Sequence, residues 1–441
     1  MSSEALNIAE KALELAKQAG AQAAAATVQR YREVDTTWRD GKLEKVSDAT
    51  SRMLTVQLYV DERYGSMVTS DLRPAALERF VADSVTMVRA LAKDPHRKLP
   101  DPATYEGRST EDLEIWDPAV PALSADDRLR RAKALEAGAR DVKEASRILS
   151  VTGSFGDYSA ELTRVTSNGF SGSYRNTYVS QSAEVSVKDD DGRRPSEWAD
   201  ASVRRLAALP TPESVGKEAT ERALRRLGAK KVASGTKTIV VEARAARGLI
   251  RHLIAPLSGS ALQQKESFLE GKLGAKIAAA PLTLVDEPLL HGALGSRPFD
   301  GEGMSTKRRP IIEKGALRSY FIDTYYARKL GVAPTIGGPT NLVVPPGTKA
   351  LEALIKDVKD GYLVTSFLGG NSNSTTGAFS LGIAGFRIER GVTKEPIGEM
   401  NMAGKHLDFW RRLAAVGNDP YVYSSTRAPS LVFDGVSVAG T

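Results

Sequence analysis

Cysteine is absent from this chain of 441 residues, and this absence limits how such a chain can be held together. No disulfide can cross-link it, and no thiolate can hold a structural zinc ion. The fold must therefore depend on buried apolar surface, and a chain of this length can supply two cores. Its 41% hydrophobic and 26% charged residues are ordinary for a globular protein.

The first half of the chain mixes helical and strand patterns. Apolar residues spaced by three and four positions predict a helix from Leu6 to Ala19, with Gly20 as its C-cap. Asp40-Gly41 lies between two strand-like segments and predicts a two-residue hairpin turn. Other segments predict helices over 74–92 and 125–145, strands over 54–60 and several within 148–188, and a pair of helices over 196–228.

The pattern changes near residue 233. Beyond it, a strand over Thr238–Glu242 and an Ala/Leu-rich helix to about Leu257 lead into short strands with frequent glycine turns. We therefore predict an α+β protein with two domains. Residues 1–233 form a sandwich-like domain of helices and sheet, and residues 234–441 form a strand-rich domain. No repeat of 20 to 50 residues is visible.

The histidines offer little for catalysis. They are His96, His252, His291 and His406, and no two lie within one helical turn. Catalytic zinc usually needs three protein ligands, so an HExxH-type site is excluded. The G-x-S-x-G nucleophile elbow and the phosphate-binding G-x-x-x-x-G-K-[ST] loop are also absent. We predict no catalytic residue in this chain; an oxygen-only magnesium or calcium site stays open, although no EF-hand-like acidic loop is present.

Three features are candidates for a binding groove. His252 lies in the Ala/Leu-rich helix, and its alternative role is that of a packing histidine with a hydrogen bond. Two glycine-polar stretches, 297–303 and 367–377, can be plain turns or can let a peptide backbone approach closely. The candidate groove residues are His252, Asp300, Glu302, Gly369, Gly370, Asn371, Thr375 and Thr376.

Charge favours neither a nucleic-acid partner nor a membrane. The net charge is +7, but 61 basic residues face 54 acidic ones, and the basic clusters are short and lack interleaved aromatic residues. Charged residues between Glu4 and Lys17 exclude the apolar core of a signal peptide, and no apolar run is long enough to span a bilayer. We expect a cytoplasmic protein, with nucleic acid an unlikely partner.

Short motifs, in order along nearly the whole chain, resemble the TldD/PmbA family. They are Asp40–Glu44, Thr166–Gly169, Ser296–Gly303, Ile312–Leu317, Tyr326–Gly331, Thr375–Gly377, Ile388–Gly391 and Val416–Asp419. The TldD branch of the family carries an HExxxH helix and a later cysteine that complete a zinc protease site. The PmbA branch, also called TldE, lacks that site.

This sequence resembles the PmbA branch. By approximate register, Arg251 and Pro256 stand where the two zinc histidines would be, and the cysteine region reads Arg427–Ser430. Neither arginine nor proline is a zinc ligand. The resemblance implies a heterodimeric peptidase in which a TldD-like subunit supplies zinc and this chain, without a cofactor of its own, helps to hold an unfolded or precursor peptide.

Two other hypotheses stay open. One is a homodimeric module that binds a peptide or small ligand in the same groove without protease activity. The other is a DNA-associated regulator, in line with the family's older label as a modulator of DNA gyrase. Such a regulator would bind DNA with an affinity that falls steeply with salt.

Overall fold

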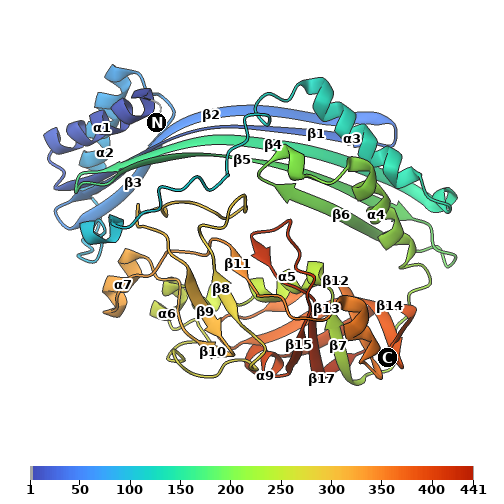
Figure 1. Ribbon diagram of the computed structural model, residues 1–441. Helices are drawn as coiled ribbons and strands as arrows, with labels where there is room; N and C mark the ends of the chain where they lie inside the picture. Colours follow the sequence, from blue (N-terminus) through green and yellow to red (C-terminus); the bar gives the residue numbers. More distant parts are fainter. Residues whose placement is uncertain (1–2, 441) are drawn as a thin grey trace.

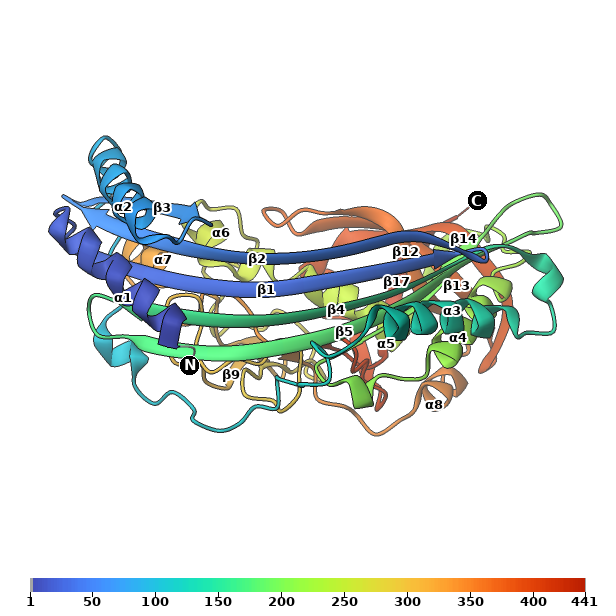
Figure 2. The same cartoon turned by 90° about the horizontal axis from the view of Figure 1, so that it is seen from above.

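The first half of the chain forms one long antiparallel sheet in the computed structural model, which describes residues 3–440. The strand order is β3-β2-β1-β4-β5-β6. The strands are β1 (Ala23–Arg39), β2 (Lys42–Val60), β3 (Arg63–Thr69), β4 (Ile148–Thr166), β5 (Ser171–Val187) and β6 (Ser196–Val203). Four of them run along most of the molecule and bend into an arch over the second half (Figures 1 and 2).

The turn between β1 and β2 confirms the predicted hairpin. Asp40 and Gly41 both have positive φ angles, 45° and 78°, which suit the twist of a two-residue turn. Asp40 also fixes the neighbouring strand, because its carboxylate accepts hydrogen bonds from Ser150 Oγ at 2.7 Å and from the Val151 N–H at 2.9 Å. The turn thus sets the register at this end of the sheet.

Helices cover the convex face of the sheet at both ends (Figure 1). They are α1 (Ser3–Gln18), α2 (Pro74–Arg89), α3 (Ala125–Arg140) and α4 (Pro212–Leu224). The buried face of α1 consists of alanines such as Ala9 and Ala12, which let it lie close to the sheet. Under it, the alternating residues from Leu54 to Val60 are completely buried, as their period of two predicts.

The N-terminal half consists of two units in which the same order of helices and strands occurs twice. Residues 3–89 run helix, three antiparallel strands, helix, and residues 125–224 run through the same order with similar lengths. The two units join where β1 pairs with β4, which makes the strand order symmetric about that pair. The sequence did not reveal this repeat, because it is close to 100 residues long and rests on topology rather than on a recurring motif.

The second half contains two further sheets. A six-stranded sheet has the order β14-β13-β12-β7-β17-β15, and an additional pairing between β14 and β17 closes it on itself. Its strands are β7 (Gly235–Val241), β12 (Asp360–Ser372), β13 (Ala378–Glu389), β14 (Val392–Lys405), β15 (Leu413–Val416) and β17 (Leu431–Ala439).

The other sheet is small and lies beside it. Its strands are β8 (Leu284–Asp286), β9 (Arg309–Glu313), β10 (Ala316–Leu317), β11 (Leu342–Val343) and β16 (Thr426–Arg427). The helices of this half are α5 (Ala243–Arg251), α6 (Gly259–Gln263), α7 (Thr324–Leu330), α8 (Leu351–Lys356) and α9 (His406–Trp410).

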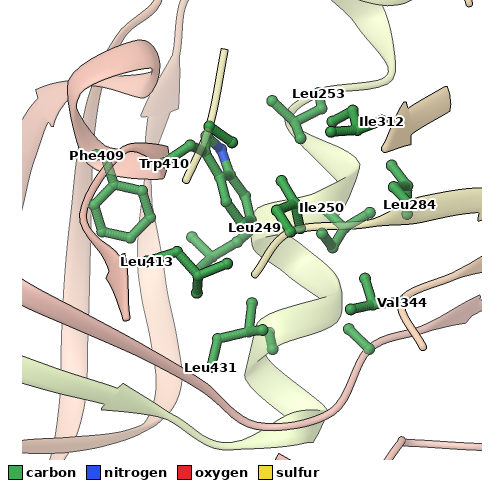
Figure 3. Close-up of a cluster of buried hydrophobic side chains, with 14 of the residues drawn as sticks. Leu249, Ile250, Leu253, Leu284, Ile312, Val344, Phe409, Trp410, Leu413 and Leu431 are labelled. Carbon is green, nitrogen blue, oxygen red and sulfur yellow. The ribbon is translucent and has the colours of Figure 1, made fainter. Parts of the chain in front are cut away.

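Helix α5 lies at the centre of the C-terminal core. Leu249, Ile250 and Leu253 are almost fully buried, and their side chains point toward Trp410 on one side and Ile312 on the other (Figure 3). This core joins both C-terminal sheets. The position of the chain just after α5 is therefore set by apolar packing.

The two halves are fastened to each other at both ends of the arch. At one end, Arg328 of α7 donates hydrogen bonds to backbone carbonyls within 96–99, and Tyr325 Oη donates to Asp94 at 2.8 Å. At the other end, the Tyr421 hydroxyl donates to the Asp200 carbonyl at 2.7 Å. Arg244 adds an ion pair with the same aspartate at 3.1 Å.

The expected α+β class is confirmed, but one predicted element is wrong. Residues 196–203 form strand β6 rather than a helix, because they pair with β5. Of the predicted helix pair, 212–224 forms an α-helix and 206–208 a single 3-10 turn. Within 148–188 the chain forms two long strands instead of several short ones. The boundary near 233 stays a prediction; it falls between the strands of the arch and those of the other two sheets. Within 3–440, no helix is long and apolar enough to cross a membrane.

Candidate functional site

The end of α5 carries the positions that the family resemblance singled out. Arg251 is the last residue of the helix and His252 is its C-cap. Pro256 lies one turn further, inside a short 3-10 helix over Ala255–Leu257, where it is buried and its carbonyl accepts a hydrogen bond from Ser267 Oγ. A proline lacks the N–H needed to continue an α-helix, so the helix predicted to reach about Leu257 cannot run through this position; α5 already ends at Arg251.

His252 lies beside a second histidine. The ring centroids of His252 and His406 are 5.8 Å apart, and His406 is also packed between Phe268 and Phe379, at 5.6 and 4.9 Å. His406 is the first residue of α9, and its backbone N–H donates to the Gly377 carbonyl at 2.8 Å. The two histidines and the glycine-polar stretch 367–377 therefore form one cluster.

His406 is a buried, neutral imidazole. Its side chain is almost fully buried, and burial together with the nearby His252 lowers its pKa from 6.5 to about 4. Its Nε2 lies 2.7 Å from Ser372 Oγ, whereas its Nδ1 is buried without a hydrogen-bond partner in the described chain. Burial also lowers the pKa of His252.

Ser372 and His406 do not make a serine-hydrolase pair. Such a pair needs a base that takes up a proton near neutral pH and a third group that orients its ring. The pKa of His406 is about 4, and no carboxylate within 3–440 bonds its Nδ1. The imidazole of His406 is therefore held by packing and a hydrogen bond within the chain and is poorly suited to moving protons near neutral pH.

The glycine-polar stretch is an exposed hairpin with a bulge. Gly369 and Gly370 have φ angles of +99° and +124°, and the β12–β13 register shifts between Phe367 and Gly370. A Cβ on Gly370 would lie 2.1 Å from the Ser380 carbonyl oxygen. Asn371 follows as an exposed residue on β12, opposite Ser380.

The turn of this hairpin is built around Asn373. Its carboxamide oxygen accepts hydrogen bonds from the N–H groups of Thr375 and Thr376, both at 2.9 Å. Thr376 Oγ1 in turn accepts from the Ala378 N–H at 3.2 Å. The two threonines, which were predicted as groove residues, are therefore exposed turn residues whose backbone is already held.

Asp300 and Glu302 belong to a different part of the structure. Asp300 accepts hydrogen bonds from the N–H groups of Glu302 and Met304, and Glu302 accepts from the N–H and hydroxyl of Thr324 at the start of α7. Burial raises the pKa of both carboxyl groups. No contact among the described residues joins them to His252, and their bonds brace a turn and a helix end.

A cavity of about 160 Å³ lies between α5 and the N-terminal half. Its lining includes Arg222, Arg244, Arg247, Arg251, Glu197 and Phe367. Arg222 and Arg244 bond to Glu242, Asp200 and Glu218 at 2.8 to 3.1 Å.

Arg251 lacks such a partner. Arg247 lies 3.5 Å from Asp200, whereas the guanidinium of Arg251 has no ion pair or hydrogen bond among residues 3–440. Burial, followed by repulsion from Arg247, lowers the pKa of Arg251. Arg251 is thus the arginine of this cavity that is free to bind an anion.

The stretch Arg427–Ser430 packs against the start of α5. Ser430 Oγ donates to Asp419 at 2.7 Å and accepts from the Ala243 N–H at 3.1 Å, which caps the first turn of the helix. Arg427 lies on β16, half-buried and without an ion pair among residues 3–440, and burial lowers its pKa. The stretch compared with the later cysteine therefore packs against the start of α5, whereas Arg251 and Pro256 lie at and beyond the end of that helix.

Comparison with known families agrees with this arrangement. The models of the PmbA/TldA metallopeptidase match in three consecutive parts: domain 1 over 24–88, the central domain over 118–227 and the C-terminal domain over 234–440. The chain belongs to the PmbA/TldD metallopeptidase family. Domain 1 and the central domain correspond to the two units of the repeat, which together form the one arched sheet.

Individual relatives point to the PmbA side of the family. The metalloprotease PmbA of Escherichia coli O157:H7 is 31% identical over 97% of this chain and 94% of its own length. A PmbA homologue of Haemophilus influenzae is 29% identical over 97% of the chain and 94% of its own length. A TldD homologue of Buchnera aphidicola, by contrast, is 28% identical over 46% of the chain and 45% of its own length.

Solved structures show the same fold along the whole chain. A Bacteroides thetaiotaomicron protein described as a putative modulator of DNA gyrase is 43% identical, with a TM-score of 0.96 and full coverage of both chains. TldE from Thermococcus kodakarensis has a TM-score of 0.88 at 21% identity, covering 98% of this chain and 100% of its own. The second likeness concerns the fold alone.

The residues around α5 do not fit the zinc ion that the family name implies. Within 3–440, no group of three His, Cys, Asp or Glu side chains is placed to hold a metal ion. The positions compared with the zinc histidines carry Arg251 and Pro256, and the neighbouring imidazoles, His252 and His406, lack a third ligand. Two imidazoles are fewer than the three protein ligands usual for catalytic zinc.

Proposed function

We propose that this chain is the non-catalytic partner subunit of a TldD-type zinc metallopeptidase that acts on unfolded or precursor peptides. The observation that carries the proposal is the set of side chains at the end of α5 that stand in place of zinc ligands. Arg251 and Pro256 occupy the positions compared with the zinc histidines, although the chain matches the PmbA/TldA metallopeptidase models over 24–88, 118–227 and 234–440. A TldD-like subunit would then hold the zinc ion of the heterodimer.

This chain would contribute a wall of the peptide-binding cavity. The exposed hairpin around Gly369, Gly370 and Asn371 offers backbone and amide groups, and the neutral pair His252 and His406 lies behind it. Extended peptides are recognised through backbone hydrogen bonds beside strands, which this hairpin can supply. Arg251 would be available to a carboxylate of the peptide, because its guanidinium has no hydrogen bond or ion pair within residues 3–440.

A reconstitution experiment tests the proposal. The chain and a TldD-like subunit are purified separately and assayed, alone and mixed, for hydrolysis of an unstructured peptide. We expect full activity in the mixture but not in either subunit by itself. We also expect the mixture to elute as a heterodimer in size-exclusion chromatography. Full activity of this chain by itself would contradict the proposal.

The same experiment separates the heterodimer from the homodimeric alternative. A chain that forms a dimer with itself, binds the peptide and leaves the rate of the TldD-like subunit unchanged would favour a binding module without protease activity. The proposal also includes a cytoplasmic location, which suits a chain without cysteine. Cell fractionation with an antibody against the chain would test that location.

A further inference from the structure

Strand β5 has an edge that is only half covered. Its second half, from Val179 to Ser186, pairs with β6, but its first half, Ser171–Tyr178, pairs with β4 alone. The outer backbone groups of this first half therefore face away from the sheet. An uncovered edge of this kind is a template for an additional strand.

The direction of the backbone groups follows from the ends of this edge. The Thr177 N–H donates to the Ile115 carbonyl at 2.9 Å and its carbonyl accepts from Arg204, so residue 177 faces outward. The Ser171 carbonyl also faces outward, because it accepts from Arg108 at 3.0 Å. The backbone N–H and carbonyl groups of successive residues point alternately to the two sides of a strand. Those of Ser173 and Arg175 therefore point outward as well.

The outward groups of Ser173 and Arg175 are not used within the described chain. On this side of β5 no strand lies beside Ser173 and Arg175, because β6 pairs only from Val179 onward. Their outward N–H and carbonyl groups make no hydrogen bond to any loop or turn either. The two residues lie about 7 Å apart along the strand. Together they offer two donors and two acceptors, spaced as an antiparallel partner strand requires.

Space for such a strand lies directly beside this edge. A cavity of about 410 Å³ is lined by Gly172, Ser173, Tyr174, Arg175, Pro298, Ile115, Trp116 and the segment 108–113. This volume falls within the range of roughly 300–1,000 Å³ of pockets that hold drug-sized ligands. The segment 108–116 forms the opposite wall, so there is room for one extended chain but not for a second sheet.

Two other uncovered edges of the same sheet differ from this one. Outward carbonyls of β6 at Ser196, Trp198 and Asp200 accept hydrogen bonds from Arg226, Arg244 and Tyr421, so that edge is already used. The open first half of β2, 42–53, is solvent-exposed and rich in charged residues, which discourages strand pairing. Of these three edges in the described part of the N-terminal sheet, the edge of β5 combines unused backbone groups with an adjoining cavity.

We propose that the edge Ser171–Tyr178 binds a single extended peptide segment as an additional strand, held by the backbone groups of Ser173 and Arg175. The inference goes beyond the proposed function, because this edge belongs to the N-terminal sheet and needs neither zinc nor a second subunit. A segment of about four residues fills the pairing positions, since a strand rises about 3.3 Å per residue.

The cavity walls determine which peptides this edge accepts. Tyr174 and Trp116 offer aromatic surface, with the guanidinium of Arg175 4.6 Å from the Trp116 ring centroid. Basic and acidic side chains, Arg108 and Glu111 among them, both line the cavity. The site therefore selects an extended backbone and tolerates side chains of either charge.

Binding to the isolated chain tests the inference. The probe is an end-capped, fluorescein-labelled hexapeptide of alternating threonine and valine. We expect it to bind and to slow amide hydrogen exchange at Ser173 and Arg175 at least about fivefold. The control probe carries N-methyl groups on the amides that would pair, and it should bind at least about tenfold more weakly, because it lacks the donors.

A substitution provides the second arm. Ser173→Pro removes one outward N–H, and proline is tolerated on edge strands at such positions. We expect S173P to bind at least about tenfold more weakly while its melting curve stays close to the wild type. No binding of the first probe up to about 1 mM, equal binding of both probes, or protection at 369–376 instead of 171–175 would each overturn the proposal. If S173P does not fold, the two probes and the exchange pattern still decide.

Discussion

His406 receives its contacts from segments that are far apart in the chain. Ser372, Phe268, Phe379 and His252 all touch it, and none lies within 25 residues of it in sequence. A single histidine surrounded by ordinary residues gives no local signal, so the sequence pointed only to His252. The resemblance to the family located Arg251 and Pro256, but it could not show that a second imidazole lies beside them.

The buried His406 predicts a loss of stability in mild acid. The unfolded chain binds a proton with a pKa near 6.5, whereas the folded chain binds it with a pKa of about 4. Between these values the unfolded state takes up more protons, so stability falls as the pH drops from about 6.5 toward 4. The difference corresponds to about 3 kcal/mol, measured as the free energy of unfolding in urea at several pH values.

A variant isolates this contribution. His406→Phe keeps a ring between Phe268 and Phe379 but removes the titrating group, so its stability should change less between pH 6.5 and 4 than that of the wild type. An unchanged pH dependence in H406F would show that His406 does not carry the effect.

At the scale of elements, short-range signals located turns better than they located strand lengths. Asp40-Gly41 predicted its hairpin because the turn needs two positive φ angles, which these residue types tolerate. The strands on either side extend to 17 and 19 residues, far beyond the few alternating positions that were visible. Much of 42–53 is exposed, so no alternation marks it as a strand. Residues 196–203 form a strand because they pair with β5, a contact that local patterns do not encode.

The hairpin 367–377 offers a matched pair of substitutions. Gly369→Ala meets no atom within 4 Å and should cost only the unfavourable φ of +99°, about 1–3 kcal/mol of unfolding free energy. Gly370→Ala has a similar φ problem, but its Cβ also collides with the Ser380 carbonyl, which adds about 1–3 kcal/mol. Chemical denaturation of both variants measures the difference. Equal costs would mean that the bulge relaxes around the added methyl group.

At the scale of the whole molecule, two units of one topology form an arch over a compact C-terminal half. The repeat became visible only in three dimensions, since it is the order of helices and strands that recurs, not a motif. The arch is held at both ends, by α7 at one end and by the arginine network of α5 at the other (Figure 1). The α5 contacts therefore link the candidate site to the N-terminal sheet.

The contacts of α7 predict where the molecule opens. Arg328→Ala removes hydrogen bonds to the carbonyls of His96, Lys98 and Leu99, so the proline-rich crossing 94–124 should be cleaved several times faster in limited proteolysis. Arg318→Ala is the control, because Arg318 bonds to Glu313 within the C-terminal half. Equal cleavage rates in the two variants would show that α7 does not fasten this segment.

The zinc content of the isolated chain tests the central claim most directly. The chain is purified without chelators, incubated with zinc, desalted and measured by metal analysis, in parallel with its complex with a TldD-like subunit. Because Arg251 and Pro256 are not zinc ligands, we predict far less than one zinc per chain alone and about one per heterodimer. One tightly bound zinc per isolated chain would contradict the claim that the TldD-like subunit, and not this chain, holds the zinc ion.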